Sequence, residues 1–454
     1  MNDISIDELR EKVRRHKVVH AVGRVRAVEG GIVRIAGLGR VARVGDRLSV
    51  LRLAAPPCCG EVLKLSDDIV DMLPDVSLEG VGLNDRVRLL SGHDIAPCDG
   101  WVGRVIDPFC KPLDGRSLPQ GSTFRALRSS PPPPAMRRGL GPRLETGLRV
   151  FNTLLPIVRG QRIGLFAGSG VGKSSLLGHF AQALCADVVV IALIGERGRE
   201  LRDFVETVLG PEGMARAIVV VATSDQPAVV RRRCAWTAMC VAEHFRDEGR
   251  QVVFLGDSIT RFAEAHREVA AAAGEAPILR GYPASTAHAI MSLCERAGSG
   301  TAESGDITAV FTVLVAGSDM DEPIADILRG VLDGHVVLER EIAERGRYPA
   351  IDLLRSVSRS LPDAASEAEN ASIRQAREVL GTYARSETMI LAGLYTPGAD
   401  VMLDQAVAAW PELDAFLAEK EESGIQNSFD RLNLLLRRVK GATHFGATPS
   451  VHET

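Results

Sequence analysis

The segment AGSGVGKS at residues 167–174 combines the residue types that bind phosphate. Its glycines allow backbone dihedrals that other residues avoid, so that successive N–H groups can point inward at phosphate oxygens. Lys173 can then reach the β- and γ-phosphates of a nucleotide, and the Ser174 hydroxyl can bind Mg²⁺. A helix predicted to begin here turns its positive end toward the same anion. The pattern predicts a nucleoside-triphosphate site.

This phosphate-binding loop departs from the usual GxxxxGK[ST] pattern at one position, because Ala167 replaces the first glycine. We expect alanine to be tolerated, since this position needs a small side chain more than a positive φ. A glycine-rich turn without a ligand is the alternative, and the apolar segments on both sides of the loop argue against it. The predicted nucleotide-binding residues of the loop are Gly168, Ser169, Gly170, Val171, Gly172, Lys173, Ser174 and Ser175.

Asp257 follows the apolar run Val252 to Leu255 and one glycine. In proteins with this kind of loop, a carboxylate at a strand end usually holds the magnesium ion. The alternative is that Asp257 caps the next helix. Together with Ser174 it forms the predicted metal site.

Glu196 follows the apolar run Val188 to Ile194. Ligand sites in open α/β sheets lie at the carboxyl ends of strands, so Glu196 can face the γ-phosphate. We predict that it polarises the attacking water. The alternative is an ion pair with Arg197 or Arg199 on a solvated loop.

Hydrolysis also needs positive charge beside the developing transition state, and an arginine finger can supply it. Arg261, four residues after Asp257, could reach the site in its own chain or could be a salt-bridged helix residue. The run Arg231 to Arg233 could bind nucleic acid. With a proline before it and an apolar segment after it, a charged first turn of a helix or a subunit contact is favoured.

The composition is that of an ordinary globular protein, with 45% hydrophobic and 25% charged residues and a net charge of -4. The charge gives no reason to expect a nucleic acid or an anionic membrane as partner. The longest apolar run, Val188 to Ile194, is too short to span a bilayer, and no secretory signal opens the chain. We therefore expect a cytoplasmic protein whose eight cysteines are small buried thiols.

The pattern along the chain predicts four parts. Residues 1–18 hold a short amphipathic helix that is either a partner-binding arm or a frayed end. Residues 19–92 alternate in short segments between turn residues, which is typical of a small β-barrel or sandwich. Residues 93–365 alternate apolar strands with helical patterns around the phosphate-binding loop, and residues 366–454 read as a helical domain.

Continuous apolar runs indicate a mainly parallel sheet that is covered on both faces. The fold class is therefore α/β. The predicted strands of this sheet are Arg162 to Phe166, Val188 to Ile194, Ile218 to Ala222, Val252 to Leu255 and Ile307 to Val315.

Eight segments together resemble the hexameric rotary-type ATPases, and within them the ATPases of type III protein export. In chain order they are AGSGVGKS, GERGRE, SDQPAVVRRR, GDSITRFAEAHRE, RGYPAST, ERAGSG, DGHVVLERE and YPAIDLLRSVSR. The resemblance covers roughly residues 20 to 440. The segment from AHREVA to YPAST, with VAGSDMDEP, is most similar to the flagellar branch of alpha-type proteobacteria.

The resemblance implies a RecA-like core between an N-terminal β-barrel and a C-terminal helical domain. It implies that Glu196 is the catalytic carboxylate, that Tyr348 packs near the adenine, and that Arg359 is a finger offered to a neighbouring subunit. ATP and Mg²⁺ are the implied substrate and cofactor. The predicted catalytic residues are Lys173, Glu196, Arg197 and Arg359.

One chain thus carries both the catalytic set and the finger, which argues for a homohexamer. The implied partners are regulator and stalk proteins, export-gate membrane proteins and chaperone–cargo complexes at the inner membrane, but no nucleic acid. At position 316 this chain has alanine where many relatives have an acidic residue, and at position 256 it has glycine where a bulkier residue is common. We place no role on residue 316.

Three alternatives stay open at this stage. The first is a virulence-type export ATPase with the same chemistry and other cargo. The second is a ring-shaped RNA translocase, although residues 19–90 contain no Phe, Tyr or Trp on which bases could stack. The third is a non-catalytic ring subunit, against which Glu196 argues.

Overall fold

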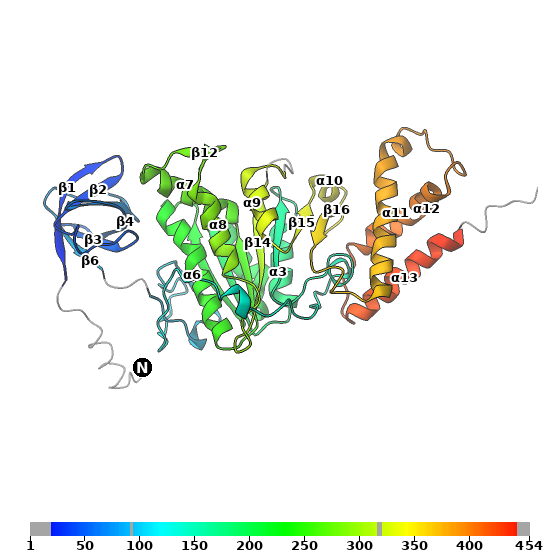
Figure 1. Cartoon of the computed structure of the whole chain (residues 1–454), viewed down its shortest axis with the longest axis horizontal. Coiled ribbons are helices and arrows are strands. Elements are labelled where there is room, and N and C mark those ends of the chain that lie inside the picture. Colours follow the sequence, from blue (N-terminus) through cyan, green and yellow to red (C-terminus); the bar gives the residue numbers. More distant parts are fainter. Residues whose placement is uncertain (1–19, 91–93, 316–319, 443–454) are drawn as a thin grey trace, which may run out of the picture.

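The computed structural model describes residues 20–90, 94–315 and 320–442 and arranges them as three units in a row (Figure 1). A small barrel lies at one end, a sheet covered by helices in the middle, and a group of helices at the other end. This confirms the predicted fold class. The helix predicted within residues 1–18 and the substituted position 316 lie outside the described residues.

The N-terminal unit is a closed barrel with antiparallel neighbours, so the barrel and not the sandwich is correct. Alternate side chains such as Val25, Val33 and Val62 fill its interior and are fully buried. Its strands, in the order β1-β2-β5-β4-β3-β6, are β1 (Val22–Glu29), β2 (Ile32–Ala36), β3 (Arg47–Leu51), β4 (Cys58–Ser66), β5 (Ile69–Pro74) and β6 (Arg86–Leu89).

The central unit is built on an eight-stranded sheet in the order β16-β15-β8-β14-β11-β9-β10-β7. All neighbours are parallel except β15 and β16. The five predicted runs form β8 (Arg162–Ala167), β9 (Val188–Glu196), β10 (Ala217–Thr223), β11 (Val252–Asp257) and β14 (Ile307–Leu314). The patterns did not predict β7 (Arg104–Ile106), β15 (Gly334–Leu338) or β16 (Ile351–Ser358), of which β7 and β16 are the edge strands.

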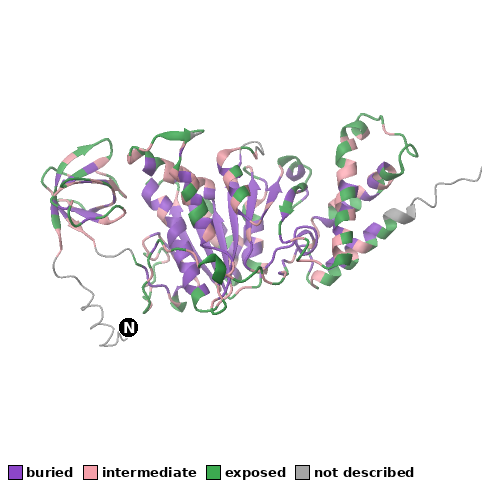
Figure 2. Ribbon diagram, in the orientation of Figure 1, coloured by how far each residue is buried: buried purple, intermediate pink, exposed green. Residues whose placement is uncertain are grey.

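Both faces of this sheet are covered, and β9 shows why its sequence is continuously apolar. Val189, Ile191 and Leu193 belong to the core on the α3 side, whereas Val190 and Ala192 belong to the core on the α6 side. Figure 2 shows the resulting buried centre. One face carries α3 (Lys173–Ala183), α4 (Gly198–Asp203), the π-helical η3 (Phe204–Leu209) and α5 (Gly210–Met214). The other face carries α6 (Ala228–Asp247), α7 (Ile259–Ala272), α8 (Ser285–Glu295) and α9 (Pro323–Val331).

Shorter elements connect these layers. They are η1 (Asp99–Trp101), η2 (Pro134–Met136), α2 (Arg149–Asn152), α10 (Arg340–Glu344) and the ribbon of β12 (Pro277–Leu279) with β13 (Tyr282–Pro283). The C-terminal unit consists of α11 (Glu367–Leu391), α12 (Val401–Phe416) and α13 (Ile425–Ala442). Leu413 and Phe416 of α12 join the same hydrophobic core as Leu176 and Phe180 of α3. The helical unit is therefore continuous with the α3 side of the sheet.

The arginine run 231–233 lies in the first turns of α6 and has partners within the chain. Arg231 contacts both carboxylate oxygens of Glu268 at 2.9 Å. Arg232 donates to Glu61 on β4 at 2.8 Å, which ties the barrel to the central unit. Arg233 donates to the carbonyl of Pro108 at 3.0 Å. These contacts favour the helix interpretation over a nucleic-acid patch.

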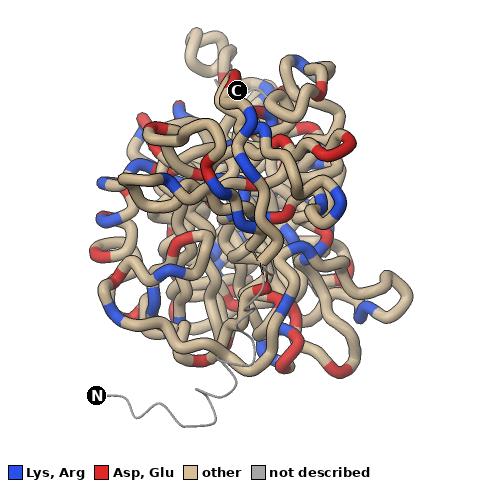
Figure 3. Tube along the Cα trace, turned by 90° about the vertical axis from the view of Figure 1, so that its left-hand side faces the viewer, with Lys and Arg blue, Asp and Glu red and all other residues tan. Residues whose placement is uncertain are grey.

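The surface carries both signs of charge, and Figure 3 shows Lys and Arg interspersed with Asp and Glu on the side that it presents. Within the described residues, no helix is long and apolar enough to span a bilayer. The cysteines are free thiols, and those at 58, 234, 240 and 294 are buried. Cys59, Cys98 and Cys110 are half-buried and Cys185 is exposed, so the expectation of eight buried thiols was wrong for these four residues. Cys185 follows the last turn of α3, where the chain turns back to β9.

Candidate active site

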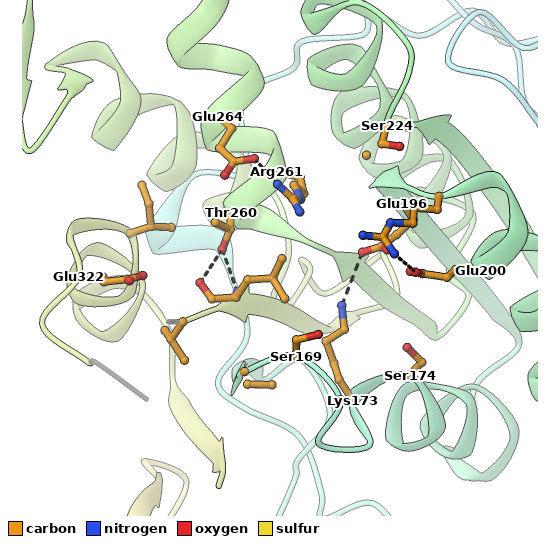
Figure 4. Close-up of a pocket in the computed structure, with 18 of the residues that line it drawn as sticks. Ser169, Lys173, Ser174, Glu196, Glu200, Ser224, Thr260, Arg261, Glu264 and Glu322 are labelled. Atoms are coloured by element: carbon orange, nitrogen blue, oxygen red, sulfur yellow. Dashed lines mark hydrogen bonds and ion pairs between the residues drawn. The ribbon is translucent and has the colours of Figure 1, made fainter. Parts of the chain in front are cut away.

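A cavity of about 1050 Å³ opens at the carboxyl ends of β8, β9 and β11, and most of the predicted site residues line it (Figure 4). The phosphate-binding loop forms one wall, with Lys173, Ser174 and Ser175. The residues after β9 form a second wall. Arg280, Tyr282 and Glu322 also line the cavity.

The loop geometry agrees with most of the glycine argument. Gly170 and Gly172 have φ of 79° and 88°, so left-handed backbone is needed at both positions. Gly168 lies outside the left-handed range, and that part of the prediction was wrong because the chain only begins to turn there. Ala167 is a fully buried strand residue opposite Leu314. A methyl group is therefore accommodated at this position, as expected.

Lys173 lies between the two predicted carboxylates. Its Nζ is 2.5 Å from Asp257 Oδ1 and 3.6 Å from Glu196 Oε1. The Thr312 hydroxyl on β14 donates to the same Asp257 oxygen at 2.7 Å. Three neighbouring strands and the first residue of α3 thus bring these groups together, because parallel strands end at one edge of the sheet.

Asp257 does not cap the helix that follows it, so the alternative interpretation was wrong. Ser258 is the N-cap of α7 and accepts from the backbone N–H of Arg261 at 3.3 Å. Asp257 is only 3% exposed and faces Lys173 and Thr312 instead. Gly256 lies within packing distance of two phenylalanines, so a bulkier side chain there would have to displace Phe254 or Phe311.

Glu196 is aimed by an irregularity in β9. Ile194 pairs with Ala222 and Glu196 pairs with Thr223, so Gly195 is an extra residue, with φ of 71°. Such a bulge bends the strand and redirects the side chain that follows. Glu196 consequently faces Lys173, and the ion pair with Arg197 or Arg199 is not the arrangement observed.

The electrostatics of the site act strongly on Glu196. Its pKa is raised to about 7, chiefly by burial. The Asp257 carboxylate and a hydrogen bond with Glu200 contribute to this rise, and Lys173 opposes it. A carboxyl with a pKa near neutrality is suited to accepting a proton at physiological pH.

Two arginines line the cavity differently. Arg197 lies at the rim, with its side chain 81% exposed and Nη1 3.6 Å from Glu200. Arg261 lies deeper and donates to Glu264 at 2.8 Å. Both predicted alternatives for Arg261 therefore hold, because it is salt-bridged on a helix and also faces the cavity of its own chain (Figure 4).

Tyr348 lies beside the phosphate-binding loop but not in the cavity wall. A Cβ built on Gly172 would lie 3.1 Å from Tyr348 Cδ1, so the ring rests against the loop. The residue is 52% exposed. It offers an aromatic face at the margin of the loop.

The structure does not bring Arg359 to the site of its own chain. Ser358 pairs with Gly334 at the start of β15, and β15 runs parallel to β8. Arg359 therefore lies near the amino-terminal ends of these strands, whereas the phosphate-binding loop lies at their carboxyl ends. It is exposed and donates to the carbonyl of Arg329 at 2.9 Å.

Sequence reasoning missed Thr312, Glu200 and the role of Gly195. A hydroxyl within the apolar run 307–314 was the available signal for Thr312. Gly195 and Glu200 are the first and last residues of the GERGRE segment, and no pattern in the sequence reveals their contacts.

The chemistry of the side chains at the site shows whether they suit Mg²⁺. No group of three or more His, Cys, Asp or Glu able to hold a metal occurs in the part of the chain described. Mg²⁺ usually takes one or two protein oxygens together with substrate phosphates. Ser174 and the buried Asp257 supply such oxygens at the edge of the loop, and this fits that ion.

Comparison with known proteins gives two matching family models. The ATP synthase alpha/beta family nucleotide-binding domain matches residues 147–358. The type III secretion EscN ATPase C-terminal domain matches residues 365–433.

Individual relatives match over most of the chain. The flagellum-specific ATP synthase of Caulobacter vibrioides is 44% identical, covering 91% of this chain and 96% of the relative. That of Salmonella typhimurium is 39% identical, covering 96% and 98%. The assembled ATPase EscN of enteropathogenic E. coli superposes with a TM-score of 0.84 at 34% identity, covering 91% of this chain and 100% of EscN. EscN in complex with its central stalk EscO gives 0.82 at the same identity and coverage.

Proposed function

This chain belongs to the family of flagellum-specific ATP synthases, and from that premise we propose that it hydrolyses MgATP at the interfaces of a homohexameric ring, driving export of unfolded flagellar proteins. It is an ATPase of the alpha/beta nucleotide-binding type. The observation that carries the proposed chemistry is the position of Lys173 between Glu196 and Asp257.

Each group in the cavity has a proposed part in the reaction. The loop N–H groups and Lys173 bind the β- and γ-phosphates and hold the γ-phosphorus in line for attack. Glu196 orients the attacking water and receives its proton, for which its raised pKa is suited. Arg197 at the rim and Arg261 inside can add positive charge near the transferring group.

We propose that Ser174 and Asp257 hold Mg²⁺. When bound, the ion neutralises charge on the phosphate oxygens. Thr312 supports this by donating to Oδ1 of Asp257, which fixes the carboxylate at the end of β11.

Arg359 is proposed to act on the neighbouring copy. Arg359 is exposed and lies at the ends of the strands opposite its own loop. Both observations support action between chains and not within one. Every copy carries both the loop and the finger, so each interface of a ring could hold one complete site. The solved structures of EscN as an assembled ATPase support oligomerisation.

The proposed partners follow from the relatives. EscN binds a central stalk, EscO, and we propose a corresponding stalk protein for this chain. A regulator, export-gate membrane proteins and chaperone–cargo complexes complete the set, with the ring at the cytoplasmic side of the inner membrane.

Flagellar export is favoured over virulence-type secretion. The flagellar relatives cited are 39% and 44% identical, whereas EscN is 34% identical. An RNA translocase is disfavoured because residues 19–90 offer no aromatic ring for base stacking.

The test is the ATPase rate per chain as a function of protein concentration. Interface sites require the rate per chain to rise steeply as rings assemble, and Lys173→Ala should remove both turnover and nucleotide binding. Full activity of verified monomers would contradict the interface site. In the source organism, deletion of the gene should abolish swimming and flagellar filaments; a motile deletion strain would contradict the flagellar assignment.

A further inference from the structure

The segment between α10 and β16, residues 345–350, connects the phosphate-binding loop with the C-terminal helices. Tyr348 lies in this segment with its ring against Gly172. An exposed tyrosine on a connecting segment is not fixed by its own packing, since half of its surface faces solvent. What holds this segment therefore decides where the ring lies.

Arg347 holds it. Its Nη1 donates to the carbonyl of Pro349 at 3.0 Å and its Nη2 donates to the carbonyl of Ile351 at 2.8 Å. These two hydrogen bonds fix the backbone immediately after Tyr348. Arg347 is only 9% exposed, so the contacts are shielded from water.

The guanidinium is in turn anchored by the C-terminal unit. Arg347 Nε lies 3.0 Å from Asp414 Oδ1 on α12. The two terminal nitrogens donate to the carbonyls while Nε forms an ion pair with the carboxylate, and a lysine ammonium would hold such an arrangement with less fixed geometry. Arg347 therefore connects the Tyr348 segment to α12.

A neighbouring arginine makes weaker contacts with the same helical unit. Arg345 Nη1 lies 4.0 Å from Glu387 on α11, both of these side chains are more than two-fifths exposed, and the guanidinium lies 5.5 Å from the centre of the Trp410 ring on α12. Exposed pairs of this kind contribute little to holding a structure. Arg345 thus provides a matched control in the same segment.

We propose that Arg347, anchored by Asp414, is a positioning residue that sets the Tyr348 ring as the platform for the nucleotide base. The inference rests on the proposed function, because it assumes that the loop binds a nucleoside triphosphate. With the phosphates in the loop, the ring beside Gly172 lies where the rest of the nucleotide can reach it. Arg347 then affects base recognition without contacting substrate.

The experiment compares ATP with inorganic tripolyphosphate, which carries no base. Full-length protein is assayed at a concentration that supports turnover, and KM and kcat for ATP are measured with the inhibition constant of tripolyphosphate. For Arg347→Met and Asp414→Asn we expect KM for ATP to rise about tenfold, the scale of one lost base–aromatic stack, with kcat and the tripolyphosphate constant nearly unchanged. Tyr348→Ala should give the same pattern, and Arg347→Met should add nothing to it. Arg345→Met should behave as wild type.

An unchanged KM in both Arg347→Met and Asp414→Asn would overturn the inference. Equal weakening of ATP and tripolyphosphate would also overturn it, because that result indicates general damage to the loop. If Arg347→Met does not fold, the KM of Asp414→Asn for ATP tests the inference by itself. Calorimetry gives the same comparison of ATP with tripolyphosphate from binding alone, without turnover. If the wild-type chain binds ATP but does not hydrolyse it, the proposed function is refuted, and the binding data still test this inference.

Discussion

Asp257 Oδ1 accepts from Thr312 at 2.7 Å while it lies 2.5 Å from Lys173 Nζ. One carboxylate oxygen thus joins β11, β14 and the start of α3. This relationship makes Thr312 a residue whose loss should affect metal binding as well as stability.

Thr312→Val should remove the hydrogen bond and keep the side-chain shape. We expect a loss of about 1–3 kcal/mol in the free energy of unfolding, because a buried carboxylate loses a donor. The Mg²⁺ concentration for half-maximal ATPase activity should rise. Thr308→Val is the control, since Thr308 on the same strand accepts from the Gly160 N–H away from the cavity. An equal Mg²⁺ shift in both variants would contradict the role of Thr312.

Gly195→Ala should displace Glu196. Its φ of 71° is strained for alanine, and the added Cβ would lie 3.3 Å from Arg261 Cβ. We expect kcat to fall by about tenfold or more, as misplacement of a catalytic group commonly does. Gly210→Ala also introduces backbone strain, at φ of 61°, but with open space around the new side chain, and should leave kcat near wild type. Normal turnover in Gly195→Ala would show that the bulge does not aim Glu196.

The raised pKa of Glu196 predicts a pH dependence of stability. The folded protein retains a proton on Glu196 up to about pH 7, whereas the unfolded chain releases it near pH 4.5. Between these values the folded state binds more protons, so this group's contribution to stability is complete below pH 4.5 and is lost as pH rises to about 7. Glu196→Gln lacks this titration.

The measurement is chemical denaturation of wild type and Glu196→Gln in this pH range without nucleotide. The stability of the variant relative to wild type should increase with pH. Glu196→Gln should also bind ATP and hydrolyse it poorly. A difference independent of pH would argue that Glu196 is already ionised in the folded state.

Mixing two inactive variants tests the placement of Arg359. Arg359→Ala keeps its own loop, and Lys173→Ala keeps its finger, so an interface that joins the two can be complete. With equal amounts and random assembly, about one quarter of interfaces should be active. Recovery of activity on mixing supports action between chains. If separately inactive variants stay inactive after verified co-assembly, the finger does not act in trans.

The sequence was sufficient for the main elements of the site. Continuous apolar runs predicted β8, β9, β10, β11 and β14. A strand that is covered on both faces needs apolar side chains on each face, so such runs do not fit a half-exposed sheet. The loop at 167–174 was predicted for a similar reason, since few residue types can form a turn that points N–H groups inward. The edge strand β16 was not predicted, because its sequence IDLLRSVS mixes buried and exposed positions at the edge of the sheet.

The residue types and their order along the chain therefore determined the kind of chemistry and the layered fold, through backbone freedom at glycine and burial of apolar side chains. Tertiary structure alone decided which groups meet. Thr312 contacts Asp257 from a different strand, a one-residue bulge directs Glu196 toward Lys173, and Arg347 reaches Asp414 across two units. Such contacts depend on strand register and on the packing of distant segments, which no local pattern encodes.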